Sequence, residues 1–418
     1  MAWVPVNVSA DAKSAAELTA RTSYGRLLAR LTRQTGNLAA AEDALADAFA
    51  QALTSWPVTG VPDSPEHWLL TVSRRRVFDA SRHNSVRSKP EVLAALASAE
   101  GTEPAADGVH DDRLRLMLVC AHPAIDEAVR PALILQVVLG LEAQQMSSAF
   151  LVSTDTLTKR LVRAKAKIKA NGLRFEEPAP EDLPARLAVL LEAIYAAYFL
   201  GKEGAVADGD PSDTLRREAV YLANVVASAL PEEPEALGFL ALLSFLDARR
   251  EAQTSAGLFV PLLEQRPATW DLALITRGNE LLSHASKARR LGPFQLEAAI
   301  QAAHCYRAKS GEVPWKEITQ LYATLIEHYP TIGARVGHAV ALASAERAPI
   351  AGLTLLSAIP PADVRSYQPY WVARAYLCEL AGDLAASREA LTRAIGLTNH
   401  PRLHQFLQHR LAALGRVM

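Results

Sequence analysis

Basic side chains are the chemistry-bearing groups that this sequence concentrates most clearly. One short segment carries Lys159, Arg160, Arg163, Lys165, Lys167 and Lys169. A single acidic residue, Asp155, opposes them, while Leu157, Leu161 and Ile168 recur at helical spacing. This pattern predicts an amphipathic helix with one apolar and one strongly basic face. Such a face attracts phosphate groups, and the alternative is a basic surface helix without a ligand.

The residues before this helix favour the first interpretation. A short helix is expected from about Leu141, with Met146, Ala149 and Phe150 as its apolar face. Residues 151–153 would form a turn, in which Ser153 is suited to cap the second helix. The major groove of DNA accepts a small helical hairpin whose second helix is basic. Taken alone, this stretch leaves DNA binding and a plain surface helix about equally open.

A second basic cluster lies upstream, and an acidic segment separates the two. The cluster consists of Arg74, Arg75, Arg76, Arg82, Arg87 and Lys89, opposed by Asp79. Residues 91–112 carry Glu91, Glu100, Glu103, Asp107, Asp111 and Asp112 but no Lys or Arg. Because this segment is also rich in small residues, it predicts a flexible linker that repels phosphate. The net charge of −1 therefore hides two basic modules, each suited to contact DNA.

Catalytic and metal-binding patterns are the other chemistry to consider, and the sequence does not favour them. Neither a GxxxxGK[ST] phosphate loop nor an HExxH metal motif occurs. Cys120 and His122 are two candidate metal ligands, but no matching pair is evident elsewhere. His304 and Cys305 likewise lack an identifiable partner. We therefore expect no metal, no cofactor and no enzymatic activity.

The composition indicates the kind of protein that must position these residues. Of the 418 residues, 50% are hydrophobic and only 6% are aromatic. Long stretches rich in Ala, Leu, Arg and Glu predict an all-α fold. Three widely separated cysteines argue against a disulfide framework and fit a reducing cytoplasm. No leader pattern and no uncharged stretch of about 18 residues is evident, so we expect a cytoplasmic protein without a membrane partner.

The N-terminal module is expected to contain three helices. Residues 24–31 show helical spacing that ends at Gly36, and residues 39–53 form a second helix with an acidic and an apolar side. The prolines between Trp56 and Pro65 predict a loop. Pro65 then suits the first position of a third helix, whose apolar stripe includes Trp68. The arginines of the upstream cluster lie toward the end of that helix.

The C-terminal half is expected to be a series of helical hairpins. It begins after Pro178 and Pro180 with an apolar helix, followed by a loop over residues 201–213. Later helices are separated at Pro231, Pro234, Pro267, Pro293, Pro314, Pro330, Pro360 and Pro361. One unit, AYLCELAGDLAASREALTRAI, matches the tetratricopeptide pattern. Such arrays commonly present a concave surface to a protein or peptide, and the alternative is a purely structural domain.

These motifs together carry a family resemblance. The order GRLLARLTRQTGNLAAAEDALADAFAQAL, then WP, then WLLTVSRRRVFD resembles region two of extracytoplasmic-function sigma factors. The basic hairpin at residues 141–169 resembles their region four. The stretch CAHPAIDEAVRPALILQVVLGLEAQQMSSAFLVSTDTLTKRLVRAKAKI is similar to the sigma-factor group with a long helical-repeat extension. The resemblance covers essentially the whole chain.

The resemblance implies three sets of binding residues and two partners, core RNA polymerase and promoter DNA. Polymerase binding falls on Glu42, Asp43, Asp47 and Phe49. Binding of the downstream, melted promoter element falls on Arg74, Arg75, Arg76 and Arg82, beside the predicted loop at residues 56–65. Upstream promoter recognition falls on Thr154, Asp155, Thr158 and Lys159 toward base edges, with Arg160, Arg163 and Lys165 on phosphates.

The resemblance also implies a domain organisation. Region two is expected at residues 1–90, the acidic linker at 91–112, region four at 113–178 and the helical repeats at 179–418. The implied function is that of an alternative sigma factor, with a C-terminal domain that regulates or completes it. Two alternatives stay open: a helix-turn-helix regulator that acts without polymerase, and a tetratricopeptide scaffold.

Overall fold

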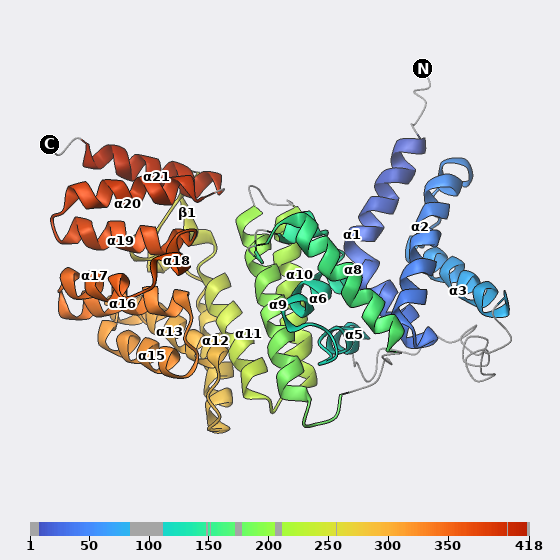
Figure 1. The fold of residues 1–418 in the computed structure, drawn as a ribbon, viewed down its shortest axis with the longest axis horizontal. Helices are drawn as coiled ribbons and strands as arrows, with labels where there is room; N and C mark the ends of the chain where they lie inside the picture. The colour runs from blue at the N-terminus through green and yellow to red at the C-terminus, as the bar shows by residue number, and fades with distance from the viewer. Residues whose placement is uncertain are drawn as a thin grey trace, which may run out of the picture. The chain divides into compact units, whose positions relative to one another are not determined.

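The structure, a computed structural model, describes residues 8–83, 112–147, 149–150, 152–171, 178–204, 211–255, 257–398 and 400–415. The chain forms two compact units, Met1–Ala229 and Leu230–Met418 (Figure 1). The described regular elements are helices apart from one small antiparallel sheet, β1 (Thr254–Ser255) with β2 (Leu258–Phe259). The predicted all-α fold is therefore confirmed. The predicted linker, apart from Asp112, lies outside the described residues, as do Arg87 and Lys89.

The first three helices of unit 1 are α1 (Val8–Thr35), α2 (Leu38–Thr59) and α3 (Pro65–His83). Gly36 ends α1 in the left-handed region, with φ of 65°. Asn37 then caps α2, because its side chain accepts a hydrogen bond from the backbone N–H of Ala40 at 3.1 Å. The three helices contact one another pairwise and bury apolar side chains between them. The largest of these are Leu28, Leu31, Leu45, Trp56 and Leu69.

The predicted loop between residues 56 and 65 is shorter than expected. Helix α2 continues through Pro57 to Thr59, so the connection begins only at Gly60. A proline removes one helical hydrogen bond, but the buried ring of Trp56 holds this last turn against α3. The Trp56 and Trp68 rings meet edge to face with centroids 5.5 Å apart. Burial of Trp56 thus keeps the last turn of α2 helical, although Pro57 on its own predicts a break.

The next described helices of unit 1 are α5 (Asp112–Cys120), α6 (Arg130–Leu139), α7 (Ala143–Met146) and α8 (Thr154–Ala170). A 3₁₀ turn, η1 (Glu127–Val129), precedes α6. Helix α7 is a single turn, so Ala149 and Phe150 lie beyond it, and the expectation that they form its apolar face was wrong. Their backbone is instead part of the turn, where the N–H of Phe150 donates to the carbonyl of Met146 at 3.2 Å.

Unit 1 ends with a long hairpin, α9 (Leu183–Gly204) and α10 (Pro211–Ala229). Helix α9 contacts α5, α6 and α10, and α10 also contacts α5. Among the described residues, α9 is the helix that is long and apolar enough to cross a membrane, over Leu183–Gly201. Half of that stretch is buried within the protein, including Leu190 and Ile194. Its apolar character is therefore explained by packing as a core helix.

Unit 2 is a series of antiparallel helices with one irregular segment near its start (Figure 1). The helices are α11 (Pro234–Ala248), α12 (Leu272–Lys287), α13 (Pro293–Cys305), α14 (Arg307–Ser310), α15 (Trp315–His328), α16 (Ile332–Glu346), α17 (Pro349–Ser357), α18 (Pro361–Val364), α19 (Gln368–Leu380), α20 (Leu384–Gly396) and α21 (Pro401–Leu414). Pro234, Pro293 and Pro361, which were predicted to separate helices, each occupy the first position of one. The hairpin predicted around Gly382 consists of α19 and α20, with Gly382 at φ of 79°.

The irregular segment of unit 2 connects α11 to α12. It contains the β1–β2 hairpin and the 3₁₀ turns η2 (Glu251–Gln253), η3 (Leu262–Glu264) and η4 (Pro267–Thr269). Phe259 on β2 packs edge to face against Phe406 of α21, with centroids 5.7 Å apart. Arg307 donates to the carbonyls of Leu262 and Leu263, both at 3.1 Å, and lies over the Trp270 ring. The hairpin therefore joins the first part of unit 2 to its last helix.

Candidate nucleic-acid and protein interfaces

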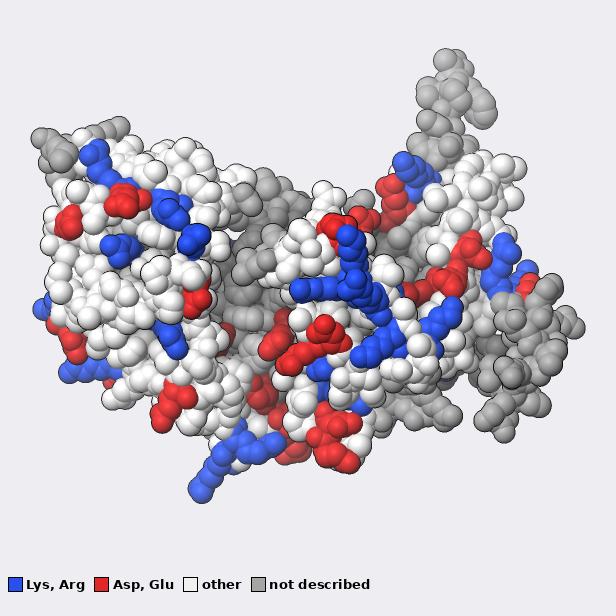
Figure 2. Space-filling model, viewed as in Figure 1, with Lys and Arg blue, Asp and Glu red and all other residues white. Residues whose placement is uncertain are grey.

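Helix α8 separates an apolar side from a basic side. Leu157, Leu161, Ala164 and Ile168 are buried, at the spacing of one helical face. The residues predicted to contact the upstream promoter element are exposed, except Lys165. They are Thr154, Asp155, Thr158, Lys159, Arg160 and Arg163. Figure 2 shows Lys and Arg side chains gathered along this helix. The exposed face is therefore suited to a polyanion.

The start of α8 is fixed by local hydrogen bonds. Ser153 accepts a hydrogen bond from the backbone N–H of Thr156 at 3.3 Å, which confirms the predicted cap. The Thr158 hydroxyl donates to the carbonyl of Thr154 at 2.8 Å. Lys159 pairs with Asp155 at 2.7 Å, one helical turn away, with both side chains largely exposed. Contact with a base edge would require Lys159 to exchange this weak surface pair for the base.

Lys165 differs from the rest of the basic face. Its Nζ lies 2.7 Å from Oε1 of Glu42 on α2, and their side chains are 30% and 16% exposed. Glu42 belongs to the residues predicted to bind polymerase, whereas Lys165 belongs to those predicted to bind DNA. The structure therefore brings together two predicted site residues that the sequence assigned to different partners.

The acidic side of α2 contains two exposed and two partly covered candidates. Asp43 and Asp47 are exposed, whereas Glu42 is held by α8. Phe49 is partly buried and stacks on Tyr24 of α1, with centroids 6.5 Å apart. Leu53, expected on the apolar side, is 49% exposed. The apolar side of α2 is therefore not buried along its whole length, because Leu53 is exposed near the end of the helix.

The arginines of α3 are not equivalent. Arg75 and Arg76 are exposed, while Arg74 is partly buried and its Nε donates to Oε1 of Gln34 on α1 at 3.0 Å. Arg82 lies in α3, but its side chain is outside the described residues. Gln34 was not among the predicted site residues, because nothing in its local sequence marks it as a partner of α3. Arg75 and Arg76 therefore remain the stronger candidates for contacting DNA.

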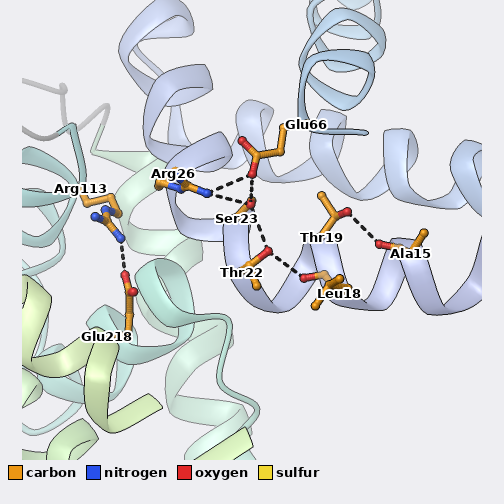
Figure 3. Close-up of polar contacts among 9 residues, drawn as sticks. All are labelled: Ala15, Leu18, Thr19, Thr22, Ser23, Arg26, Glu66, Arg113 and Glu218. Carbon is orange, nitrogen blue, oxygen red and sulfur yellow. Dashed lines mark hydrogen bonds and ion pairs between the residues drawn. The ribbon is translucent and has the colours of Figure 1, made fainter. Parts of the chain in front are cut away.

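A polar cluster holds the beginning of α3 against α1 (Figure 3). Arg26 Nη2 lies 3.0 Å from both Glu66 Oε1 and Ser23 Oγ. The Ser23 hydroxyl also donates to Glu66, and Ser23 is buried. Together with the Arg74–Gln34 bond, this cluster attaches α3 to α1 near the start and the middle of the helix. These contacts fix the position of α3, and with it that of the exposed Arg75 and Arg76.

Helix α5 links the first three helices to the α9–α10 hairpin. Arg33 of α1 pairs with Asp112 at 3.2 Å. The next residue, Arg113, is buried, pairs with Glu218 of α10 and lies over the Tyr221 ring (Figure 3). These contacts make α9 and α10 part of the same packed unit as the candidate site.

The candidate metal ligands have structural roles in the described residues. Cys120 is buried in α5, and burial, followed by the charge of Glu42, raises the pKa of its thiol. Nδ1 of His122 accepts a hydrogen bond from the N–H of Ala124 at 3.0 Å. Within the part of the chain that the structure describes, no group of three or more His, Cys, Asp or Glu side chains could hold a metal ion.

Comparison with known proteins gives two family matches and one close relative. Residues 20–87 match sigma-70 region 2, and residues 186–286 match a family of unknown function, DUF6596. The chain is 33% identical over 392 residues to an uncharacterized protein of Rhizobium meliloti (strain 1021), covering 92% of both chains. No solved structure matches. The first match covers most of α1 together with α2 and α3, and the second runs from α9 to the end of α12.

Proposed function

This chain belongs to the same family as its Rhizobium meliloti relative and contains sigma-70 region 2, and from this premise we propose that it is an alternative sigma factor. Sigma-70 region 2 supports a role in RNA polymerase binding and promoter recognition, and sigma-type proteins are not an enzyme family. The finer proposal is that the chain is of the extracytoplasmic-function type. It would direct core RNA polymerase to a restricted set of promoters from within the cytoplasm.

One observation carries this proposal. The region 2 match falls on α1–α3, where α2 exposes Asp43 and Asp47 and α3 exposes Arg75 and Arg76. An acidic helix face complements a basic helical partner such as a coiled coil of polymerase. Exposed arginines complement the backbone of a single strand, as promoter opening requires. Two oppositely charged surfaces on neighbouring helices fit a protein that joins polymerase to DNA.

Helix α8 would supply the second promoter contact. In this proposal α7, the turn and α8 act as a helix-turn-helix, with Thr158 and Lys159 near base edges and Arg160 and Arg163 on phosphates. A regulator that works without polymerase would need only this part of the chain. The region 2 match favours the polymerase-dependent role over that alternative.

The helical repeats would complete the factor. Unit 2 is a helical array of the kind that binds a protein or peptide on its concave surface. We favour a requirement for this domain in transcription over an inhibitory role. Residues 179–418 contain 23 Lys and Arg against 25 Asp and Glu, so this part of the chain has no strong acidic excess that would drive masking of the basic surfaces.

Charge reversal on α2 tests the proposed polymerase contact. Asp43→Arg with Asp47→Arg should weaken binding of core polymerase about tenfold or more, because both side chains are exposed and would then repel a basic partner. Glu346→Arg, an exposed acid of unit 2, is the matched control. Binding is measured by fluorescence anisotropy with labelled full-length protein. Equal affinity of the wild type and the double variant would exclude this surface.

A further inference from the structure

We propose that α8 is an internal partner of the polymerase-facing surface of α2, so that α8 and core polymerase compete for Glu42. This inference rests on the proposed function, because the pairing regulates the factor only if α2 binds polymerase. It concerns a contact between two segments of unit 1 that the sequence assigned to different ligands.

The central contact is the ion pair between Lys165 and Glu42. The atoms Nζ and Oε1 are 2.7 Å apart, and the two side chains are 30% and 16% exposed. The other acids of the same surface, Asp43 and Asp47, are exposed. A partner that approaches α2 would thus meet those two carboxylates directly but would find Glu42 covered by α8.

The position of Lys165 on α8 explains how its side chain reaches α2. It follows Ala164 and precedes Ile168 by three residues, and both of these side chains are buried. Lys165 therefore lies at the edge of the apolar face, where α8 contacts α2. Lys167 and Arg163 point away from that edge and are exposed. If α8 separated from α2, Lys165 would be free to contact a DNA phosphate, as these exposed residues are.

The surroundings of Glu42 show that its carboxylate faces the interior of unit 1. Burial, and after it the charge of Glu42, raises the pKa of Tyr24. Glu42 acts in the same direction on the thiol of Cys120, whereas Lys165 lowers that pKa. Tyr24 lies on α1 and Cys120 on α5, so the charge of Glu42 affects ionisable groups on two helices besides α2 and α8.

The helices around the ion pair are closely packed. A Cβ added at Gly25 of α1 would lie 1.8 Å from the carbonyl oxygen of Val138 on α6, so glycine is required for this approach. Helix α6 in turn contacts α8, and α1 contacts α2. The ion pair between α2 and α8 therefore belongs to a packed set of helices and is not an isolated surface contact.

The pairing couples the two ligands of the factor. While the ion pair persists, Glu42 does not contact polymerase and Lys165 does not contact a DNA phosphate. Binding of polymerase to Glu42 would release Lys165 for DNA, and by linkage DNA binding would favour polymerase binding to the same extent. The free factor is thereby biased against binding either ligand alone.

A distance measurement tests the contact without polymerase. Nitroxide labels are placed at Gln51→Cys on α2 and Ala166→Cys on α8 of the full chain, where both native residues are exposed. Lys165→Glu should lengthen and broaden the distance distribution, and Lys165→Glu with Glu42→Lys should restore it. Lys167→Glu, the same charge change on an exposed neighbour, should leave it unaltered. An unaltered distribution in Lys165→Glu would overturn the proposal.

A binding measurement then tests the competition. Lys165→Ala keeps Glu42 and should raise affinity for core polymerase about two- to fivefold, the range expected when a modest ion pair no longer opposes binding. Lys167→Ala is the matched control and should bind as the wild type does. Equal affinity of Lys165→Ala and wild type overturns this inference alone. Failure of every form to bind core polymerase overturns the proposed function, and this inference with it.

Discussion

At the scale of single residues, the three adjacent arginines of α3 have different environments. Arg74 is bonded to Gln34 on α1, whereas Arg75 and Arg76 are exposed. The sequence places the three charges in one cluster, because periodicity along α3 does not reveal what the neighbouring helix offers. Arg74 therefore positions α3, and we propose that Arg75 and Arg76 are the residues that contact DNA.

An exchange of side chains separates these roles. Arg74→Gln should lower the free energy of unfolding by about 1 kcal/mol, the usual contribution of one hydrogen bond, and adding Gln34→Arg should restore most of it. Arg75→Gln should leave stability within about 0.5 kcal/mol, but reduce the salt dependence of single-stranded DNA binding by about one unit of slope. Urea unfolding and salt titrations supply the measurements. If the exchange fails to restore stability while Arg74→Gln alone flattens the salt dependence, Arg74 is itself a DNA contact.

His304 of α13 makes unit 2 sensitive to mildly acidic pH. Burial, and then the charges of Arg249 and Arg307, lowers the pKa of His304 from 6.5 to about 4. As the pH falls, the histidine is therefore protonated in the unfolded chain before it is protonated in the folded one. The free energy of unfolding should decrease by at most roughly 3 kcal/mol between about pH 6.5 and pH 4, and then become constant. Above pH 6.5 the histidine contributes no dependence.

Thermal unfolding between pH 7 and pH 4 checks this expectation. His304→Gln should remove most of the decline that His304 causes, whereas His284→Gln, at an exposed position of α12, should preserve it. If the stability of wild type and His304→Gln depends on pH in the same way, the pKa of His304 is not lowered in the folded protein.

At the scale of elements, the α9–α10 hairpin packs with the helices that lead to α8. Helix α9 contacts α5 and α6, and Arg186 of α9 donates to the carbonyl of Leu118 at 3.3 Å. The sequence suggested a boundary near Pro178, where prolines cluster, but a chain ending there would leave α5 and α6 without these contacts. Exposing several buried leucines is unfavourable by about 1.5–3 kcal/mol each.

Two truncations test this packing. A chain ending at Pro178 should aggregate or unfold with a broad, weakly cooperative transition, whereas one ending at Ala229 should remain monomeric and unfold cooperatively. Size-exclusion chromatography and circular dichroism distinguish the outcomes. Equal stability of the two truncated chains would mean that α9 and α10 do not support the helices before them.

The elements themselves were largely predictable, and the exceptions have physical reasons. Apolar residues at helical spacing, capping residues and prolines predicted the helices around Tyr24, Glu42 and Leu187, because these signals are local. Proline at position 57 misled the prediction, since the burial of Trp56 depends on a helix distant in sequence. Helix α7 was predicted too long because Ala149 and Phe150, which follow helical spacing in the sequence, belong to the turn after it.

Pairings between elements could not be predicted. Lys165 and Glu42 are 123 residues apart, and each has a plausible external ligand of its own. The sequence therefore identified both residues as candidate binding groups but could not show that they bind each other. The same holds for Arg113 with Glu218, and for the approach of Gly25 to Val138.

At the scale of the whole molecule, the division into units differs from the division into family matches. The DUF6596 match begins in α9 of unit 1 and ends in α12 of unit 2, so one matched segment contributes to both. The part of this match that lies in unit 1 falls on α9 and α10, which contact α5. The chain ending at Ala229 keeps those helices and therefore isolates what unit 2 itself adds to transcription.

Run-off transcription shows directly whether this chain directs core RNA polymerase to promoters. Purified core polymerase is combined with the full chain on a library of promoter fragments from the genome that encodes the polymerase. We expect discrete transcripts that require the chain and are strongly reduced by Asp43→Arg with Asp47→Arg, but not by Glu346→Arg. A complete lack of chain-dependent transcripts, with core polymerase shown to be active with another sigma factor, would contradict the proposed function.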